Sequence, residues 1–230
     1  EGRSGIWTLT FFLLPFVSGM IVQGKHEAIR ENVSLLTGAV IQCFFFATVQ
    51  LFIFADTILI YWLGPEFLAA TAVMRITFVS ITFYASYIAL RSILDAARVK
   101  PVNAINLLIS LAVFSLVAGA LLLLFKPISP LISLSAAFTC GLICLGALTY
   151  YSIRKIYPQK IALDLRYLWT AIAINVLLGG IAVVAKPFVI SRFYYPILFE
   201  VFLGAIYLMS LWVLKVDWIR QIPRKLRTKD

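Results

Sequence analysis

Ionisable and hydrogen-bonding side chains within long apolar segments are the residues of this sequence that could do chemistry. Arg75 stands out, because it lies inside an apolar stretch that follows the turn-forming residues Gly64 and Pro65. A cation in the hydrocarbon of a membrane costs about 3 kcal/mol or more unless it pairs with an anion, faces water or extends to the interface. Arg75 is therefore the first residue to consider for a function.

Three further polar residues share a helical face with Arg75. At about 100° per residue, Thr71, Thr82 and Ser86 fall on the same side of a helix as the arginine. Polar groups within a membrane need partners, so we expect this stripe to face the interior of a helix bundle or an aqueous cavity. A second interpretation stays open, because Arg75 is only about six residues from the outer boundary and a guanidinium reaches water from there.

Asn103, Asn106 and Ser110 form a second polar stripe at the start of another apolar segment. Their spacing of three and four residues places them on one helical face. Hydrogen bonds between helices explain this spacing as well as ligand binding does. On the binding interpretation, Asn103 and Asn106 line a substrate route together with the stripe of Arg75.

Two carboxylates lie inside the apolar segments as well. Glu200 shares a helical face with Gly204 and Tyr207, and Asp56 lies near the outer end of another segment. Either carboxylate could be a counter-ion for an arginine or a protonatable residue that couples transport to an ion. Both are also close enough to the outer boundary to be merely hydrated.

Signatures of catalysis and of bound cofactors are absent from the sequence. It has no P-loop, no H-E-x-x-H, no G-x-S-x-G and no cluster of paired carboxylates. Cys43, Cys140 and Cys144 fall in apolar segments and the only histidine is His26, so neither a disulfide framework nor a metal site can be assembled from them. We predict a protein that is not an enzyme and needs no cofactor.

Membrane-spanning helices must position these residues. The chain of 230 residues is 62% hydrophobic with a mean hydropathy of +0.98, whereas soluble domains are about 45 to 50% apolar. Its apolar runs are continuous and long enough, as helices, to cross about 30 Å of hydrocarbon. We therefore predict an all-α, polytopic membrane helix bundle. About seven helices are expected, at residues 6–22, 33–62, 67–90, 102–125, 128–153, 166–190 and 196–214.

The basic residues predict how the bundle is oriented. Of the 20 Lys and Arg residues, 15 lie in alternate loops and in the basic tail at 215–230, and 5 lie on the opposite side. By the positive-inside rule the richer side is cytoplasmic, so the N-terminus is outside the cell and the C-terminus inside. The net charge of +10 would suggest a nucleic-acid partner in a soluble protein, but the basic residues here lie in alternate loops, so we predict a cell membrane protein that does not bind nucleic acid. The tail could attract anionic lipids of the inner leaflet, although a plain topology determinant explains its charge too.

Three motifs between residues 11 and 106 belong to an arrangement that covers nearly the whole chain. They are FFLLPFVSG with Pro15 in mid-helix, the outer turn IYWLGPEF, and ALRSILDAARVK followed by NAIN. This arrangement resembles the C-terminal half of polysaccharide flippases, in the superfamily that also holds multidrug and toxic compound exporters and lipid II flippases. The resemblance implies one lobe of a two-lobe bundle of twelve or fourteen helices that opens alternately to each side of the membrane.

The resemblance also implies a substrate. Family members typically carry undecaprenyl-diphosphate-linked oligosaccharides, whose anionic diphosphate would meet Arg75 in a cationic cavity. Because the family has two lobes, we expect this chain to be a fragment or to pair with another copy or chain. The leading hypothesis is a flippase lobe for polysaccharide or O-antigen export in the cell inner membrane. Two alternatives stay open, a cation-coupled multidrug-type exporter with Glu200 or Asp56 as coupling carboxylate, and a noncatalytic membrane scaffold for polysaccharide synthesis.

Overall fold

Helices form all of the regular secondary structure in the part of the chain that the structure, a computed structural model, describes. The described residues are 26–97, 101–124, 129–156, 165–190 and 194–214, so the predicted helix at 6–22 and the tail at 215–230 lie outside them. The helices are α2 (His26–Ile53), α3 (Ala55–Trp62), η1 (Pro65–Ala70, a 3-10 helix), α4 (Thr71–Phe78), α5 (Ile81–Ala97), α6 (Val102–Leu124), α7 (Pro130–Ile156), α8 (Leu165–Val189) and α9 (Tyr194–Val213).

The helices α6, α7, α8 and α9 are each long and apolar enough to cross a membrane. Two more spans result if each of two bent pairs counts as one, namely α2 with α3 and η1–α4 with α5. The described residues therefore hold four to six candidate spans. This confirms the prediction of an all-α chain with apolar helices suited to several membrane crossings, while the predicted count of seven is not reached within them.

The span expected as one helix over residues 33–62 is interrupted. α2 ends at Ile53, α3 begins at Ala55, and the two are bent by 68°. The amide of Thr57, which a continuous helix directs at the carbonyl of Ile53, donates to Oδ1 of Asp56 at 2.8 Å. A side chain that competes with the main-chain acceptor ends a helix. The prediction of an unbroken helix therefore fails at Phe54.

The span expected over residues 67–90 is interrupted too, with a bend of 44° between residues 65–78 and 81–95. The amide and the hydroxyl of Ser80 donate to the carbonyl of Thr77 at 3.1 and 2.7 Å. Thr139 of α7 donates its hydroxyl to the carbonyl of Ile76 at 2.9 Å. These hydroxyls satisfy main-chain groups that a bend frees, as a membrane requires.

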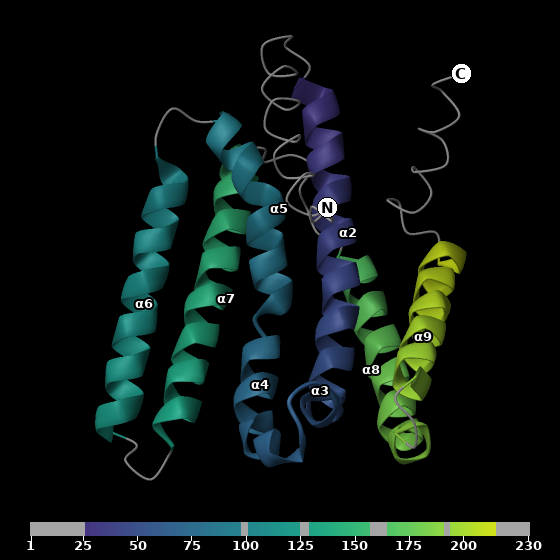
Figure 1. Ribbon diagram of the computed structural model, residues 1–230. Coiled ribbons are helices and arrows are strands. Elements are labelled where there is room, and N and C mark those ends of the chain that lie inside the picture. Colours follow the sequence, from purple (N-terminus) through teal and green to yellow (C-terminus); the bar gives the residue numbers. More distant parts are fainter. Residues whose placement is uncertain (1–25, 98–100, 125–128, 157–164, 191–193, 215–230) are drawn as a thin grey trace, which may run out of the picture.

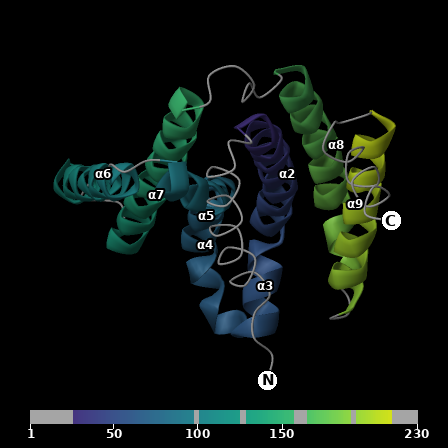
Figure 2. The same cartoon turned by 90° about the horizontal axis from the view of Figure 1, so that it is seen from above.

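The helices stand side by side in a curved row, with α6 and α7 at one end, α8 and α9 at the other, and the two broken spans between them (Figures 1 and 2). α6 packs on α7, α7 on α5, α5 on α2, α2 on α8, and α8 on α9. α3, η1 and α4 lie together at one end of the bundle, at the bottom of Figure 1.

Two kinds of contact hold this row together. Small residues bring α7 close to its neighbours: at Gly146 a Cβ atom would lie only 2.5 Å from the carbonyl oxygen of Phe83 in α5. On the other side of the row, larger apolar side chains pack α2 against α8 and α9. The buried residues of this cluster are Phe54, Leu178, Ala182, Leu203, Tyr207 and Leu211.

Candidate functional site

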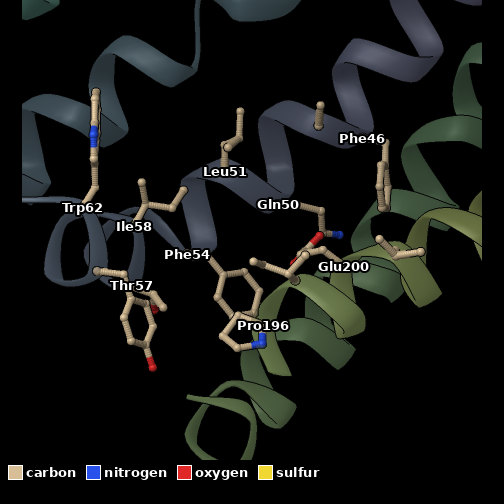
Figure 3. A pocket seen from close by; sticks show the side chains of 13 residues that line it. Phe46, Gln50, Leu51, Phe54, Thr57, Ile58, Trp62, Pro196 and Glu200 are labelled. Atoms are coloured by element: carbon tan, nitrogen blue, oxygen red, sulfur yellow. The ribbon is translucent and has the colours of Figure 1, made fainter. Parts of the chain in front are cut away.

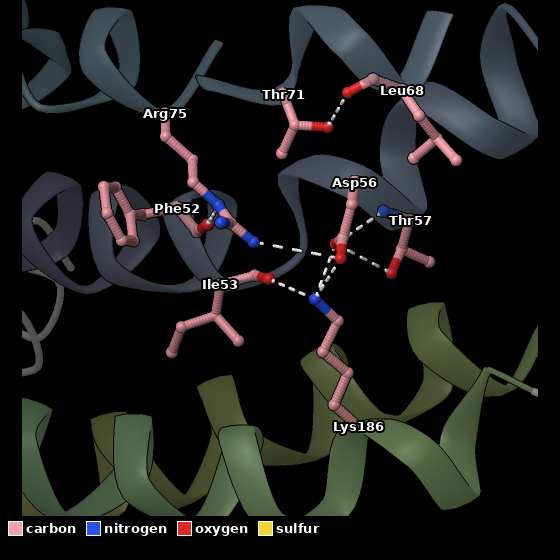
Figure 4. Close-up of polar contacts among 8 residues, drawn as sticks. All are labelled: Phe52, Ile53, Asp56, Thr57, Leu68, Thr71, Arg75 and Lys186. Atoms are coloured by element: carbon pink, nitrogen blue, oxygen red, sulfur yellow. Dashed lines mark hydrogen bonds and ion pairs between the residues drawn. The ribbon is translucent and has the colours of Figure 1, made fainter. Parts of the chain in front are cut away.

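Three charged side chains from three helices meet at the break between α2 and α3 (Figure 4). Nζ of Lys186 in α8 lies 2.5 and 2.7 Å from the two carboxylate oxygens of Asp56 in α3. Nη2 of Arg75 in α4 lies 3.8 Å from Oδ2 of the same carboxylate. We call Arg75, Asp56 and Lys186 the charge cluster.

The charge cluster also binds the main chain of the broken span. Lys186 donates to the carbonyl of Ile53 at 2.7 Å, and Nε of Arg75 donates to the carbonyl of Phe52 at 3.2 Å (Figure 4). Both carbonyls belong to the last turn of α2, where a helix carries partial negative charge. Asp56 lies in the first turn of α3, where the helix dipole favours an anion. The cluster therefore stabilises both helix ends that the break creates.

The charge cluster holds two cations and one anion, so one positive charge is in excess. The exposed fraction of the side chain is 38% for Arg75, 31% for Asp56 and 17% for Lys186. Lys186 holds the carboxylate at hydrogen-bonding distance, whereas Arg75 lies farther from it and also stacks over the ring of Phe52, 5.7 Å from the centroid. Arg75 is thus the cation that remains able to accept a further anion.

The other residues of the predicted stripe on α4 and α5 make local and interhelical hydrogen bonds. Thr71 donates to the carbonyl of Leu68 at 2.7 Å. Thr82 is buried and shares a hydrogen bond of 2.9 Å with Thr48 of α2. Ser86 is buried as well and donates to the carbonyl of Thr82 at 2.8 Å. These are contacts of helix packing, and none of the three predicted residues joins the charge cluster.

The two asparagines of α6 tie that helix to its neighbours. Nδ2 of Asn106, a buried residue, lies 3.3 Å from Oγ of Ser152 in α7. Nδ2 of Asn103 lies 3.4 Å from Oδ2 of Asp95 in α5. Both contacts favour the packing interpretation of this stripe over the ligand-binding one.

A pocket of about 680 Å³ lies between the broken span and α9 (Figure 3). This volume falls in the range of small-molecule sites. Of the residues that the sequence singled out for a site, only Glu200 lines it. Most of the wall is apolar, with Phe46, Phe54 and Trp62 on the side of α2 and α3, and Pro196, Ile197 and Val201 on the side of α9.

Besides the hydroxyls of Thr57 and Tyr61, two polar side chains interrupt the apolar wall, Gln50 of α2 and Glu200 of α9. Their polar ends point toward one another in the close-up (Figure 3). Gln50 is only 4% exposed, and neither its amide nitrogen nor its amide oxygen has a hydrogen-bond partner among the described residues. Oε1 of Glu200 is buried and has no partner in this part of the chain either. Buried polar atoms in proteins are nearly always hydrogen-bonded, so these three atoms call for an explanation.

No family model, no curated protein and no solved structure matches the chain. The function must therefore be inferred from the charge cluster and the pocket themselves. Within the described ranges, no three His, Cys, Asp or Glu side chains gather closely enough to hold a metal ion.

Two residues of these sites were not selected from the sequence. Lys186 was counted only among the basic residues of the outer side, although it lies in an apolar segment just as Arg75 does. The energetic cost of placing a cation inside a membrane is the signal by which Lys186 could have been predicted. Gln50 gave a weaker signal, because a single amide in an apolar helix is compatible with many kinds of packing.

Proposed function

We propose that the chain is one transmembrane lobe of a flippase, which moves an undecaprenyl-diphosphate-linked oligosaccharide across the cell membrane by alternating access. The observation that carries this proposal is the charge cluster, which holds an excess positive charge at a broken membrane span. The family resemblance of the sequence supplies the class of substrate. A second lobe, from another chain or another copy, completes the pathway.

Arg75 is the residue that meets the diphosphate. A guanidinium donates paired hydrogen bonds to phosphate oxygens, and these bonds are stronger than those between neutral groups. Arg75 can turn toward such a ligand while Lys186 keeps Asp56 paired at 2.5 and 2.7 Å. The cluster thus accepts an anion without leaving its own carboxylate unpaired in the membrane.

The break in the span suits a helix that moves during transport. Transporters of several folds place their substrate and ion sites at discontinuous helices. Here the cluster joins three separate helices, and the contact of 3.8 Å between Arg75 and Asp56 is its weakest link. Rocking of α4 away from α8 would open the cluster at this contact first, which connects anion binding to a change in the bundle.

The test is export of surface polysaccharide by cells that depend on this protein. We expect Arg75→Ala to lower export about tenfold or more, since a hydrogen bond to a charged group contributes about 1.5 to 3 kcal/mol. Arg75→Lys should keep part of the activity, because it keeps the charge. The matched control is Arg154→Ala, which removes an exposed arginine from the last turn of α7 and should leave export unchanged.

Arg75 also binds the carbonyl of Phe52, so the assay must separate transport from folding. The amount of each variant in the membrane is measured alongside export, and export is expressed per inserted molecule. Lipid-linked oligosaccharide should accumulate at the inner face when transport fails. Export at the wild-type level by a normally inserted Arg75→Ala protein would reject the role of Arg75.

A further inference from the structure

The pocket between the broken span and α9 is a second site, separate from the charge cluster. The side chains of Gln50 and Glu200 interrupt its apolar wall, and the atoms named above make no hydrogen bond to any described residue (Figure 3). Arg75 and Lys186 are both engaged by Asp56 and by the carbonyls of α2, and no ion pair joins Glu200 to a described residue. The pocket therefore combines a large apolar volume with a carboxylate that lacks a cation.

A plain hydrocarbon chain does not suit this pocket. It would cover the amide of Gln50 and the carboxylate of Glu200 with groups that can neither donate nor accept a hydrogen bond. Polar atoms buried in that way are strongly disfavoured. The ligand must therefore place a polar group next to Gln50 and Glu200.

An inorganic cation does not suit it either. A hard metal cation takes about six oxygen ligands in proteins. The side chains that line the pocket offer at most five oxygens, two from Glu200 and one each from Gln50, Thr57 and Tyr61. The main-chain carbonyls of the described walls lie within helices, except that of Phe54, which accepts from the amide of Ile58 at 2.9 Å. A large, mainly apolar wall with two polar side chains at one point is the lining of an organic ligand site.

We propose that this pocket binds an amphipathic amine, in the form of its ammonium ion. Oε1 of Glu200 and the amide oxygen of Gln50 are covered in the structure. The two side chains therefore turn into the pocket to accept hydrogen bonds from the ammonium group, whose charge neutralises the carboxylate. The hydrocarbon part lies along Phe54, Ile197 and Val201. This site stands whether or not the chain is a flippase lobe.

Binding of matched probes tests the proposal. Full-length protein is placed in phosphatidylcholine nanodiscs at neutral pH, and binding of dodecylamine and of 1-dodecanol is measured by equilibrium dialysis, with empty nanodiscs subtracted. The two probes share a chain length, and only the amine is charged. We expect the protein to bind the amine about tenfold or more tightly than the alcohol. Equal affinity for the two probes overturns the proposal.

Two pairs of variants locate the site. Glu200→Gln should abolish the preference for the amine, while Glu66→Gln, at an exposed carboxylate of η1, should retain it. Val201→Trp fills the pocket from α9 and should lower amine binding about tenfold, whereas Val213→Trp, at an exposed position of the same helix outside the pocket, should not. A preference for the amine that survives Glu200→Gln, or unchanged binding in Val201→Trp, rejects the site. Because Val201 is exposed, Val201→Trp still tests the site if Glu200→Gln fails to fold.

Discussion

Asp56 and Lys186 are 130 residues apart in the chain, yet Nζ of the lysine lies 2.5 Å from Oδ1 of the aspartate. The same Nζ donates to the carbonyl of Ile53, the last residue of α2. One lysine of α8 therefore binds both halves of the broken span. The position of α8 and the bend between α2 and α3 depend on each other.

Removing either partner of this pair should destabilise the protein. Lys186→Met keeps the length of the side chain but leaves Asp56 and the carbonyl of Ile53 without their donor. We expect the free energy of unfolding to fall by about 1 to 3 kcal/mol, less than for a fully buried pair because both side chains are partly exposed. The double variant with Asp56→Asn should lose less than the sum of the single losses when unfolding is followed in detergent micelles. Strictly additive losses would show that the two residues are not coupled.

Gly146 should tolerate no larger residue. In Gly146→Ala the new Cβ atom would lie 2.5 Å from the carbonyl oxygen of Phe83, a main-chain atom that moves only with α5. We expect a loss of about 1 to 3 kcal/mol in the free energy of unfolding, as for other overpacked contacts. Gly119→Ala in α6 is the matched control, because nothing lies within 4 Å of its Cβ position. Similar stability of the two variants would contradict the close contact of α5 with α7.

The hydroxyl of Tyr207 should contribute to the docking of α9. It donates to the carbonyl of Gln42 in α2 at 2.9 Å and lies 3.4 Å from Nδ2 of Asn175 in α8. Tyr207→Phe keeps the ring and removes this link, so we expect a loss of about 1 to 2 kcal/mol in the free energy of unfolding. Tyr151→Phe, at an exposed position of α7, should be neutral. An equal effect of both changes would argue against this link between the three helices.

Labelling of single cysteines should reveal the orientation in the membrane. In a background without Cys43, Cys140 and Cys144, Glu66→Cys places a thiol on η1 and Arg154→Cys places one at the far end of α7, and both positions are exposed. By the positive-inside rule, a membrane-impermeant maleimide should label position 66 in intact cells and position 154 only after permeabilisation. The opposite pattern would reverse the proposed orientation.

Composition alone was sufficient to predict a helix that depends only on its own sequence. The helix expected at residues 102–125 appears as α6, Val102–Leu124, because an unbroken run of lipid-compatible residues has no main-chain alternative to a helix in a membrane. The two breaks were not predicted, because partners from elsewhere in the chain add to the local hydrogen bonds of Asp56 and Ser80 at these points. Lys186 and Thr139 satisfy carbonyls at these breaks, and neither residue is a neighbour in sequence.

The candidate sites, like the helices, could be predicted from the sequence only in part. The cost of charge in a membrane selected Arg75 and Asp56, which the structure places 3.8 Å apart. Helical phase also selected Thr82 and Asn106, whose side chains bind neighbouring helices instead. A phase angle identifies a shared face but does not say whether that face meets a cavity or another helix. The pocket was not predicted, because its two walls come from α2–α3 and α9, which only tertiary packing brings together.

The long separation of Asp56 from Lys186 has a consequence for biosynthesis. A ribosome adds about 5 to 20 residues per second, so the 130 residues between them take roughly 6 to 26 s. Arg75 is made only 19 residues after Asp56 and is the first of the two cations of the charge cluster to be synthesised. Arg75 lies farther from Asp56 than Lys186 does in the finished fold, yet it is synthesised before Lys186. We therefore expect Arg75 to pair with Asp56 in the nascent chain before Lys186 is made.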